Sequence, residues 1–221
     1  MNPVSFSVPV RALRALARFV SQDESRYVIT GVFFELRGEV CNLVATDGRK
    51  LAAMQVELDT VEPIEKADYI LDVGQILDWK LGTYYDDAGD FHNEEWPSDK
   101  VQVRIFDSCV YLNCGWRIAA GKVIEGNFPN WRNLFKPDDF KKGAVSESAL
   151  DSDFLHAFGL AKRELNGIFL AHIAILYQDS PSAPMLIDIG VPRFTGLLMP
   201  VKQGDFGLPI STREQLISWI V

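Results

Sequence analysis

The sequence has few of the features that secreted proteins and membrane proteins need. Its three cysteines, Cys41, Cys109 and Cys114, form no Cys-x-x-Cys pair and are too few to cross-link a chain of 221 residues, which fits a reducing compartment. No stretch approaches the ~18 to 20 consecutive apolar residues that cross a bilayer, and the N-terminus has no charged segment followed by an apolar one. We therefore expect a cytoplasmic protein without membrane contact.

Histidine is equally scarce and gives no sign of a metal or catalytic centre. His92, His156 and His172 are far apart, and none belongs to a His-Glu-x-x-His or His-x-His motif. His156 stands between Phe154 and Phe158, where a packing or surface histidine is commoner than a ligand. No phosphate-binding Gly-x-x-x-x-Gly-Lys or Gly-x-Gly-x-x-Gly motif occurs. We predict no catalytic residues, no metal site and no cofactor.

One acidic segment keeps a metal-dependent alternative open. The segment over 86–100, DDAGDFHNEEWPSDK, offers carboxylate groups for a divalent cation. Its acidic residues lack the fixed spacing of a calcium-binding loop, so a solvated loop is the simpler interpretation. An enzyme or metal-dependent regulator acting through this loop is the least favoured hypothesis.

Positive charge is also in short supply. The chain has 22 lysines and arginines against 30 acidic residues, for a formal net charge of −8, which argues against a protein that grips nucleic acid over its whole surface. Arg11, Arg14 and Arg18 nevertheless stand at i, i+3 and i+7 of a segment with helical periodicity. At about 100° per residue they share one stripe opposite the apolar side, which predicts a basic ridge.

The residues that are abundant indicate a packed core and a first structural unit. Hydrophobic residues make up 48% of the chain, enough for one large domain or two modest ones. A helix is predicted over 8–22, with Pro9 in its first turn, and strands over 27–36, 39–45 and 50–58. Gly38 and Gly48 mark the two turns between these strands, because glycine accepts the positive φ that tight turns require.

The same order of elements recurs twice more. In the second unit a strand is predicted over 69–71, a helix over 73–81 and strands over 101–106, 110–113 and 116–124. In the third unit a helix is predicted over 151–163 and strands over 167–177, 184–189 and 194–201. The sequence thus predicts an α+β fold of three βαβββ units, with helices on one face of antiparallel sheets. The units 5–58 and 68–126 are expected to pair into one closed domain.

Four runs of sequence point to one protein family. They are 26–31 (RYVITG), 44–52 (VATDGRKLA), 122–132 (KVIEGNFPNWR) and 197–202 (LLMPVK). In this order they resemble segments of the bacterial DNA polymerase III beta subunit, the beta sliding clamp family, the first three being similar to its middle domain. The resemblance is close over 5–137 and partial over 142–202. It implies a DNA-clamp (processivity-factor) fold and a non-catalytic role in DNA replication beside DNA polymerase III.

The resemblance also implies a pocket for linear peptides of the DNA polymerase and the clamp loader. The turn over 46–51 and the run 197–200 would form its walls, so these two stretches must lie side by side. The residues assigned to the pocket are Ile29, Thr46, Gly48, Arg49, Lys50, Leu51, Pro137, Leu197, Met199 and Pro200. An apolar groove with a flexible methionine suits several leucine- and phenylalanine-bearing peptides. For any single residue, a plain core position is the alternative.

The family turns its helices toward double-stranded DNA, which they contact through phosphates without reading sequence. The residues that the resemblance assigns to this DNA-facing surface are Arg11, Arg14, Arg18, Lys80, Lys162 and Arg163. A solvated helix face explains any one of these charges equally well. The stripe of three arginines favours the DNA-facing interpretation.

Compared with the family, the chain is short. We expect a complete clamp domain over 1–137, a partial one over 138–203 and a tail over 204–221 that suits a short helix. Three units cannot close a two-chain ring in the family's manner, although four chains would supply the same number of units. A homo-oligomeric clamp therefore stands against a second hypothesis, a non-encircling adaptor or inhibitor of phage or mobile-element type.

Overall fold

The structure, a computed structural model, describes residues 4–60, 64–79, 83–85, 91–93, 98–135, 150–166, 174–176 and 183–201. Its helices in these ranges are α1 (Val10–Ala17), α2 (Ser152–Asn166) and the 3-10 helices η1 (Glu24–Ile29), η2 (Gly74–Asp78) and η3 (Trp131–Leu134). Its strands are β1 (Val4–Pro9), β2 (Val32–Arg37), β3 (Val40–Thr46), β4 (Lys50–Glu57), β5 (Lys66–Leu71), β6 (Thr83–Tyr85), β7 (Phe91–Asn93), β8 (Lys100–Phe106), β9 (Cys109–Cys114), β10 (Arg117–Ile124), β11 (Ala174–Leu176), β12 (Met185–Asp188) and β13 (Phe194–Leu198). None of the described helices is long and apolar enough to cross a membrane.

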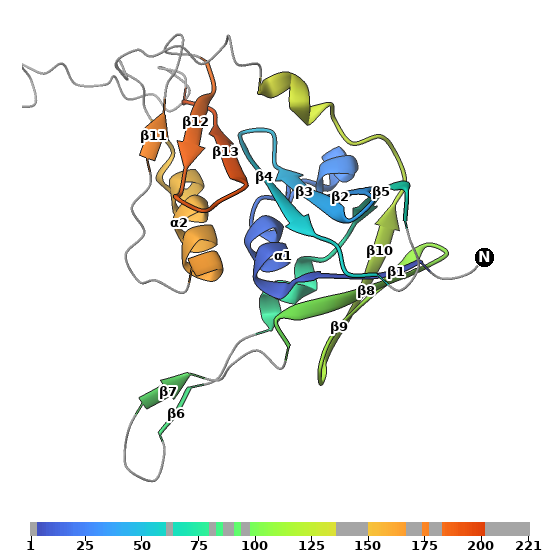
Figure 1. The fold of residues 1–221 in the computed structure, drawn as a ribbon. Coiled ribbons are helices and arrows are strands. Elements are labelled where there is room, and N and C mark those ends of the chain that lie inside the picture. Colours follow the sequence, from blue (N-terminus) through green and yellow to red (C-terminus); the bar gives the residue numbers. More distant parts are fainter. Residues whose placement is uncertain are drawn as a thin grey trace, which may run out of the picture.

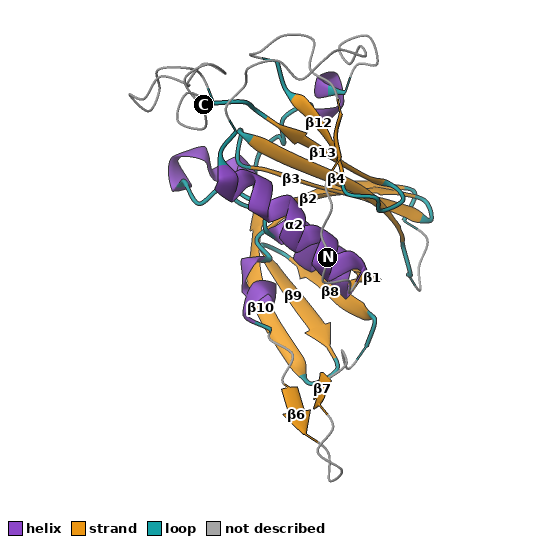
Figure 2. Cartoon of the chain, turned by 90° about the vertical axis from the view of Figure 1, so that its left-hand side faces the viewer, coloured by secondary structure: helices purple, strands orange, loops and turns teal. Residues whose placement is uncertain are grey.

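Eleven strands form one antiparallel sheet in the order β1-β8-β9-β10-β5-β2-β3-β4-β13-β12-β11. Figure 2 shows them in two groups, with β12, β13, β4, β3 and β2 in the upper group and β1, β8, β9 and β10 in the lower one. Helix α1 lies between the groups and contacts β1, β3 and β4 (Figure 1). Strands β6 and β7 form a separate hairpin. The sheet thus curls around its helices.

The first two units exchange their leading strands. β1 precedes α1 in the chain but pairs along its whole length with β8 of the second unit. β5 opens the second unit but pairs with β2 of the first. A bridge between Ser7 and Asp59 closes the remaining gap between β1 and the end of β4. This interlocking joins the described strands of the first two units.

The main core lies between the two groups of strands and holds helix α1. Alternating positions of the strands point into it, so that β8 and β9 show the inward and outward periodicity of a half-buried sheet. Its largest fully buried side chains are Phe6, Phe19, Phe34, Phe158, Leu13, Leu16, Leu36, Leu43, Leu71, Ile76, Leu112 and Met185. At about 1.5 to 3 kcal/mol for each large apolar side chain, this burial is the main term that stabilises the fold.

The third unit joins the first by a strand pair and a helix pair. β13 adds to the free edge of β4, and α2 packs beside α1. The rings of Phe19 and Phe158 meet edge to face with centroids 4.8 Å apart. Gly196 permits this contact, because a Cβ at this position would lie 2.2 Å from Cε1 of Phe158. Gly196 therefore has a structural role, because it lets Phe158 of α2 pack closely against β13.

Two helix predictions need correction. The helix predicted over 8–22 begins at Val10 and ends at Ala17, because the residues up to Pro9 extend β1 and pair with β8. The helix predicted over 73–81 is the five-residue 3-10 helix η2. It starts at Gly74, a poor helix former, whose N–H bonds to the side chain of Asp72 at 3.3 Å and forms a turn.

The strand predicted over 27–36 also begins late, at Val32. The residues before it form η1, because the carboxylate of Asp23 accepts the backbone N–H of Ser25 at 3.0 Å and caps a helical turn there. Of the strand predicted over 167–177, the structure describes only Ala174–Leu176. The predicted positive φ angles are present, at +60° for Gly38 and +88° for Gly48.

Candidate functional site

The turn between β3 and β4 is held by its own side chains. The hydroxyl of Thr46 donates to the carbonyl of Lys50 at 2.8 Å and accepts the N–H of Gly48 at 2.9 Å. The carboxylate of Asp47 accepts the backbone N–H groups of Arg49 (2.8 Å) and Lys50 (2.9 Å). These local bonds give the turn one defined conformation and leave Gly48 and Arg49 exposed.

Arg26 braces this turn from outside, a role that the sequence analysis did not assign. Its Nη1 donates to the carbonyl of Asp47 at 2.9 Å. Its guanidinium lies so close to Gly48 that a Cβ there would be 2.1 Å from Nη2. The RYVITG run thus contributes to the site through Arg26, and the only earlier signal was its place in a motif.

Strand β13 brings the late LLMP run against this turn. Leu197 pairs with Leu51, and Leu198 pairs with Lys50. The N–H of Met199 donates to the carbonyl of Arg49 at 2.7 Å. The prediction that the two stretches lie side by side is therefore confirmed, although 146 positions separate Leu51 from Leu197 in the chain (197 − 51).

Leu51 and Leu197 belong to an apolar group on the outer face of the sheet, opposite α1. We call this group the outer cluster; its members are Val44, Leu51, Ala53 and Leu197, with Phe33, Phe128, Trp131, Phe135 and Leu186 packed against them. Phe33 and Phe128 stack with centroids 4.8 Å apart and planes 4° apart. Residues 128–135 thus cover part of the outer face. Met199, with 37% of its surface exposed, lies beyond the paired strands next to the turn.

A buried carboxylate anchors the covering segment to the sheet. Glu35 in β2 is only 6% exposed. Its carboxylate accepts hydrogen bonds from both terminal nitrogens of Arg132, the one from Nη1 at 2.8 Å. Asn42 donates to it at 2.8 Å, and Arg37 at 3.0 Å. The hydrogen bond from Arg132 is the largest of the effects that lower the pKa of Glu35, and it outweighs the opposing effect of burial. The sequence analysis missed this ionic group.

The structure separates some residues that the sequence assigned to the pocket. Lys50 faces the opposite side of the sheet from Leu51. Its side chain is 11% exposed and forms an ion pair with Asp47, and its Nζ lies 5.1 Å from the ring centroid of Phe154. Ile29 is 4% exposed and ends η1, where its carbonyl accepts the N–H of Ser21. Pro200 is half-buried beside Met199. Pro137 lies outside the described residues.

The predicted ridge of three arginines is wrong at its centre. Arg14 is 7% exposed, and its Nη1 donates to the carbonyls of Ile76 and Trp79 while its Nε donates to Glu164 at 2.8 Å. Arg18 also reaches Glu164, at 3.3 Å. The pattern of charges placed both arginines opposite the apolar side of α1, but α2 and η2 cover that side of the helix.

The other predicted DNA-facing residues have different surroundings. Arg11 is exposed on α1, Arg163 is exposed on α2 and Lys162 is half-buried there. Lys80 lies outside the described residues. Of the three arginines in the stripe, Arg11 alone is fully exposed.

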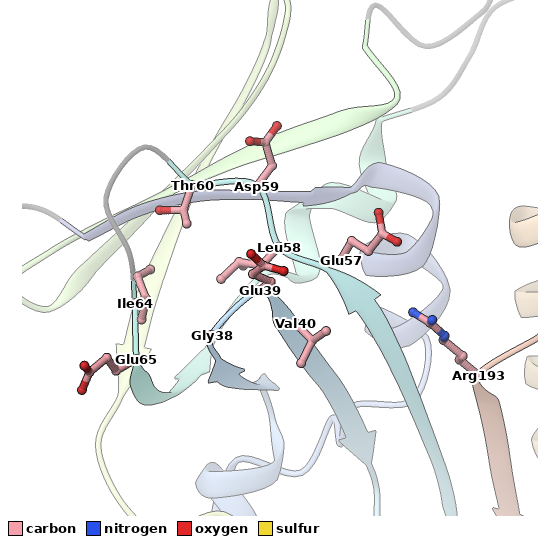
Figure 3. A pocket seen from close by; sticks show the side chains of 10 residues that line it. All are labelled: Gly38, Glu39, Val40, Glu57, Leu58, Asp59, Thr60, Ile64, Glu65 and Arg193. Atoms are coloured by element: carbon pink, nitrogen blue, oxygen red, sulfur yellow. The ribbon is translucent and has the colours of Figure 1, made fainter.

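Two hollows are lined in part by residues of β4, and neither includes a residue of the 46–51 turn. One, of about 280 Å³, lies beside the outer cluster; its lining residues are Asn42, Ala53, Met54, Gln55, Trp131, Phe135, Arg193 and Thr195. A larger one, of about 600 Å³, lies where β4 ends and includes Glu39, Glu57, Asp59 and Glu65 (Figure 3). At about 3.3 Å per residue it is roughly 20 Å along β4 from Leu51. Its acidic rim disfavours a phosphate backbone.

The described residues contain no group of three or more His, Cys, Asp or Glu side chains that could hold a metal ion. Most of the acidic segment over 86–100 lies outside them, so the metal-dependent hypothesis stays an expectation there.

Sequence comparisons connect this chain with one family. The family model described as DNA polymerase III beta subunit, central domain, matches residues 7–130. The beta sliding clamp of Chlamydia trachomatis is 29% identical over 114 residues, which are 51% of this chain and 24% of that protein. The beta sliding clamp of Escherichia coli K12 is 23% identical over 177 residues, which are 76% of this chain and 44% of that protein. The matches therefore span less than half the length of these relatives.

The fold agrees with a solved structure. The crystal structure of a DNA polymerase III beta subunit from Thermotoga maritima matches with a TM-score of 0.57 and 17% sequence identity, over 90% of this chain and 65% of that one. At this identity the likeness shows the fold, and the predicted DNA-clamp fold is confirmed.

Proposed function

Because this chain belongs to the DNA polymerase III beta subunit family, whose central domain its residues 7–130 match, we propose that it is a sliding-clamp-like, non-catalytic processivity factor of DNA replication. Its partners would be peptides of the DNA polymerase and the clamp loader, and double-stranded DNA. Its place would be the cytoplasm. The proposal rests on one observation. Pairing of β4 with β13 brings Met199 against the 46–51 turn, where its N–H bonds to the carbonyl of Arg49.

The peptide would dock at the junction of the turn and the LLMP run. Met199 offers an exposed thioether there, Arg49 stands at the rim, and Thr46, only 8% exposed, holds the turn from within. Leu51 and Leu197, both under 5% exposed, form the floor. Gly48, Pro137 and Pro200 remain proposed peptide contacts. Ile29 and Lys50 would support the pocket without touching the peptide. Docking of this kind is typically micromolar, about −8 kcal/mol, which permits exchange between partners.

The test is a fluorescence titration with a labelled QLSLF-type peptide. We expect saturable binding in the range of about 1 to 100 μM and at least about tenfold weaker binding in Met199→Ala. Leu134→Ala, which truncates an exposed side chain on η3, is the matched control and should bind as the wild type does. Thermal unfolding of each variant separates lost binding from lost folding. No saturation at hundreds of micromolar, or equal affinity of Met199→Ala and wild type, would contradict the proposal.

A second candidate is an adaptor or inhibitor that binds the same peptides without encircling DNA. It is supported by charge, because the chain carries a net charge of −8 and Arg14, at the centre of the predicted basic ridge, is buried. The corresponding domain proposal is a complete clamp domain over 1–137, a partial one over 138–203 and a tail over 204–221. Retention on closed circular DNA in the presence of a clamp loader would favour the encircling clamp. Peptide binding without retention would favour the adaptor.

A further inference from the structure

Strands β1, β8, β9 and β10 turn one side away from the core. Val103, Val110 and Leu112 are buried toward the core, so the residues that alternate with them point to the other side. We call this side the lower face, after the lower group of strands in Figure 2. It consists of the odd-numbered residues of β1 and β9 and the even-numbered residues of β8 and, up to Lys122, of β10.

Two aromatic rings and one branched side chain are exposed on the lower face. Phe106 on β8 and Tyr111 on β9 are about half exposed, and Ile118 on β10 is 68% exposed. The strand register places Phe106 and Ile118 diagonally next to Tyr111, on either side of it. A continuous group of exposed apolar side chains of this kind is typical of a binding surface.

The charge of the lower face is opposite to that of the chain. None of the residues that form this face is an aspartate or a glutamate, although the chain has 30 of them and a net charge of −8. Its cations are Lys100, Arg104 and Lys122. Lys100 pairs with Asp59 at 3.0 Å, and Asp107 stands in the turn after β8. Arg104 and Lys122, both exposed, are therefore the cations that the face offers to a ligand.

Rings and cations alternate around Tyr111. Arg104 lies directly opposite it on β8, and Lys122 lies diagonally next to it on β10, as Phe106 does on β8, at roughly 7 to 8 Å between Cα atoms. Ala120, directly opposite on β10, is small and leaves room for a flat ligand beside the tyrosine ring. A ligand that combines flat apolar groups with negative charge would meet both kinds of side chain at once.

We infer that the lower face binds single-stranded nucleic acid, with bases stacked on Tyr111 and Phe106. Arg104 and Lys122 would neutralise the neighbouring phosphates. Exposed rings accept any base, so this arrangement holds a single strand without reading its sequence.

Other ligands fit this face less well. Lysine is depleted from the centre of protein interfaces, whereas Lys122 stands next to the central ring. The bases of a duplex are stacked on one another and are not free to stack on side chains. The inference adds a ligand and a surface to the proposed function, because the lower face contains neither the peptide-docking site nor the helices assigned to duplex DNA.

The test is fluorescence anisotropy of a labelled oligothymidylate of about 10 nucleotides, titrated with the full chain at about 50 mM salt. We expect saturable binding that weakens with salt, with a slope of about 1 to 2 for log K against log salt concentration, because each neutralised phosphate of a single strand adds about 0.7. Tyr111→Thr, which keeps a side chain that suits a strand, should weaken binding at least about fivefold. Arg104→Gln should lower the slope by about 0.7.

The controls change exposed residues of the same types elsewhere. Tyr27→Thr on η1 and Arg193→Gln in the turn before β13 should leave oligonucleotide binding unchanged. An abasic oligonucleotide of the same length has the same charge and no bases, so it should bind at least about fivefold more weakly than the oligothymidylate. Thermal unfolding verifies that each variant is folded.

Several outcomes would overturn the inference. They are the absence of saturation at hundreds of micromolar, equal affinity of Tyr111→Thr and wild type, and equal binding of the abasic oligonucleotide, which would show that charge alone explains the binding. An acidic peptide that binds in a Tyr111-dependent manner, where the oligonucleotide does not bind, would assign the face to a protein partner instead.

The QLSLF-type peptide keeps this inference separate from the proposed function. It should not displace the oligonucleotide, and Tyr111→Thr should bind it as the wild type does. Displacement would place the single strand at the docking site and overturn the inference. Loss of peptide binding in the wild type, with oligonucleotide binding intact, would contradict the proposed docking site alone.

Discussion

Glu35 shows how one buried charge holds a segment over the site. The carboxylate lies at the sheet surface beneath Arg132, and the apolar residues around Arg132 cover part of the outer cluster. Removing one partner of such a pair leaves a buried charge without compensation, which costs more than the pair itself contributes. The carboxylate therefore governs how firmly residues 128–135 stay in place.

Stability should depend on the ionisation of Glu35. Its pKa in the folded protein is lowered from the ordinary value of 4.5, chiefly by the hydrogen bond from Arg132. The folded state thus prefers the charged form, so the contribution is complete above about pH 4.5 and is lost as the pH falls through the lowered pKa. We expect Glu35→Gln to cost about 1 to 3 kcal/mol at pH 7 and to flatten the loss of stability below pH 5.

Urea unfolding at pH 7, 5, 4 and 3 measures this effect, because the loss is expected below about pH 4.5. Glu125→Gln, at an exposed position, is the control and should keep the wild-type pH dependence. A Glu35→Gln protein that loses stability on acidification as steeply as the wild type would show that other carboxylates are responsible.

Single residues were predictable where their conformation is local. Gly38 and Gly48 adopt positive φ because tight turns require it, and no distant contact is involved. Arg14 was not predictable in this way. Helical spacing predicts on which side of α1 the Arg14 side chain lies. It does not predict the bonding partners, because the carbonyls and the carboxylate that Arg14 bonds belong to η2, Trp79 and α2, which are distant in the sequence.

At the level of elements, Glu164 joins two helices of different units. It accepts hydrogen bonds from Arg14 and Arg18, so α2 supplies the negative charge that the buried arginine of α1 requires. We expect Glu164→Ala to destabilise the fold by about 3 to 5 kcal/mol, because Arg14 loses its anionic partner. Urea unfolding measures the loss, with Glu125→Ala as the control.

Hydrogen exchange identifies which strands lose stability in Glu164→Ala. The amides of β12 and β13 should exchange faster in Glu164→Ala, while those of β8 and β9 should keep their protection, because the third unit docks through α2 and β13. Uniformly faster exchange in both sets would indicate that the units unfold together and would contradict a separable third unit.

Most elements were predictable from periodicity, and their departures have local causes. The strands β3, β4, β8 and β9 follow alternating or branched runs. The helix predicted over 73–81 is shortened to η2, since Gly74 and the side chain of Asp72 favour a turn. Pairing between β4 and β13 has no local signal. It was expected only through the resemblance to the clamp family, and its register came from the structure.

For the whole molecule, the proposed contact with DNA depends on how much positive charge the helices expose. The chain carries a net charge of −8, and Arg14 is turned into the protein. On the described helices Arg11 and Arg163 are exposed, and Arg18 and Lys162 are half-buried. The described helices of one chain would therefore bring at most four cationic side chains to DNA phosphates. A basic DNA-binding protein offers many more over its whole surface.

Salt dependence of DNA binding measures this number directly. Each neutralised phosphate adds about 0.9 to the slope of log K against log salt concentration, so binding to a short duplex should be weak, with a slope of about 3 to 4 at most. Arg11→Gln should lower the slope by about 1, as measured by fluorescence anisotropy. Arg193→Gln, which removes an exposed cation at the acidic hollow near the end of β4, should leave it unchanged. A slope that responds to Arg193 and not to Arg11 would place DNA on the outer face, and the helices would then have no part in DNA binding.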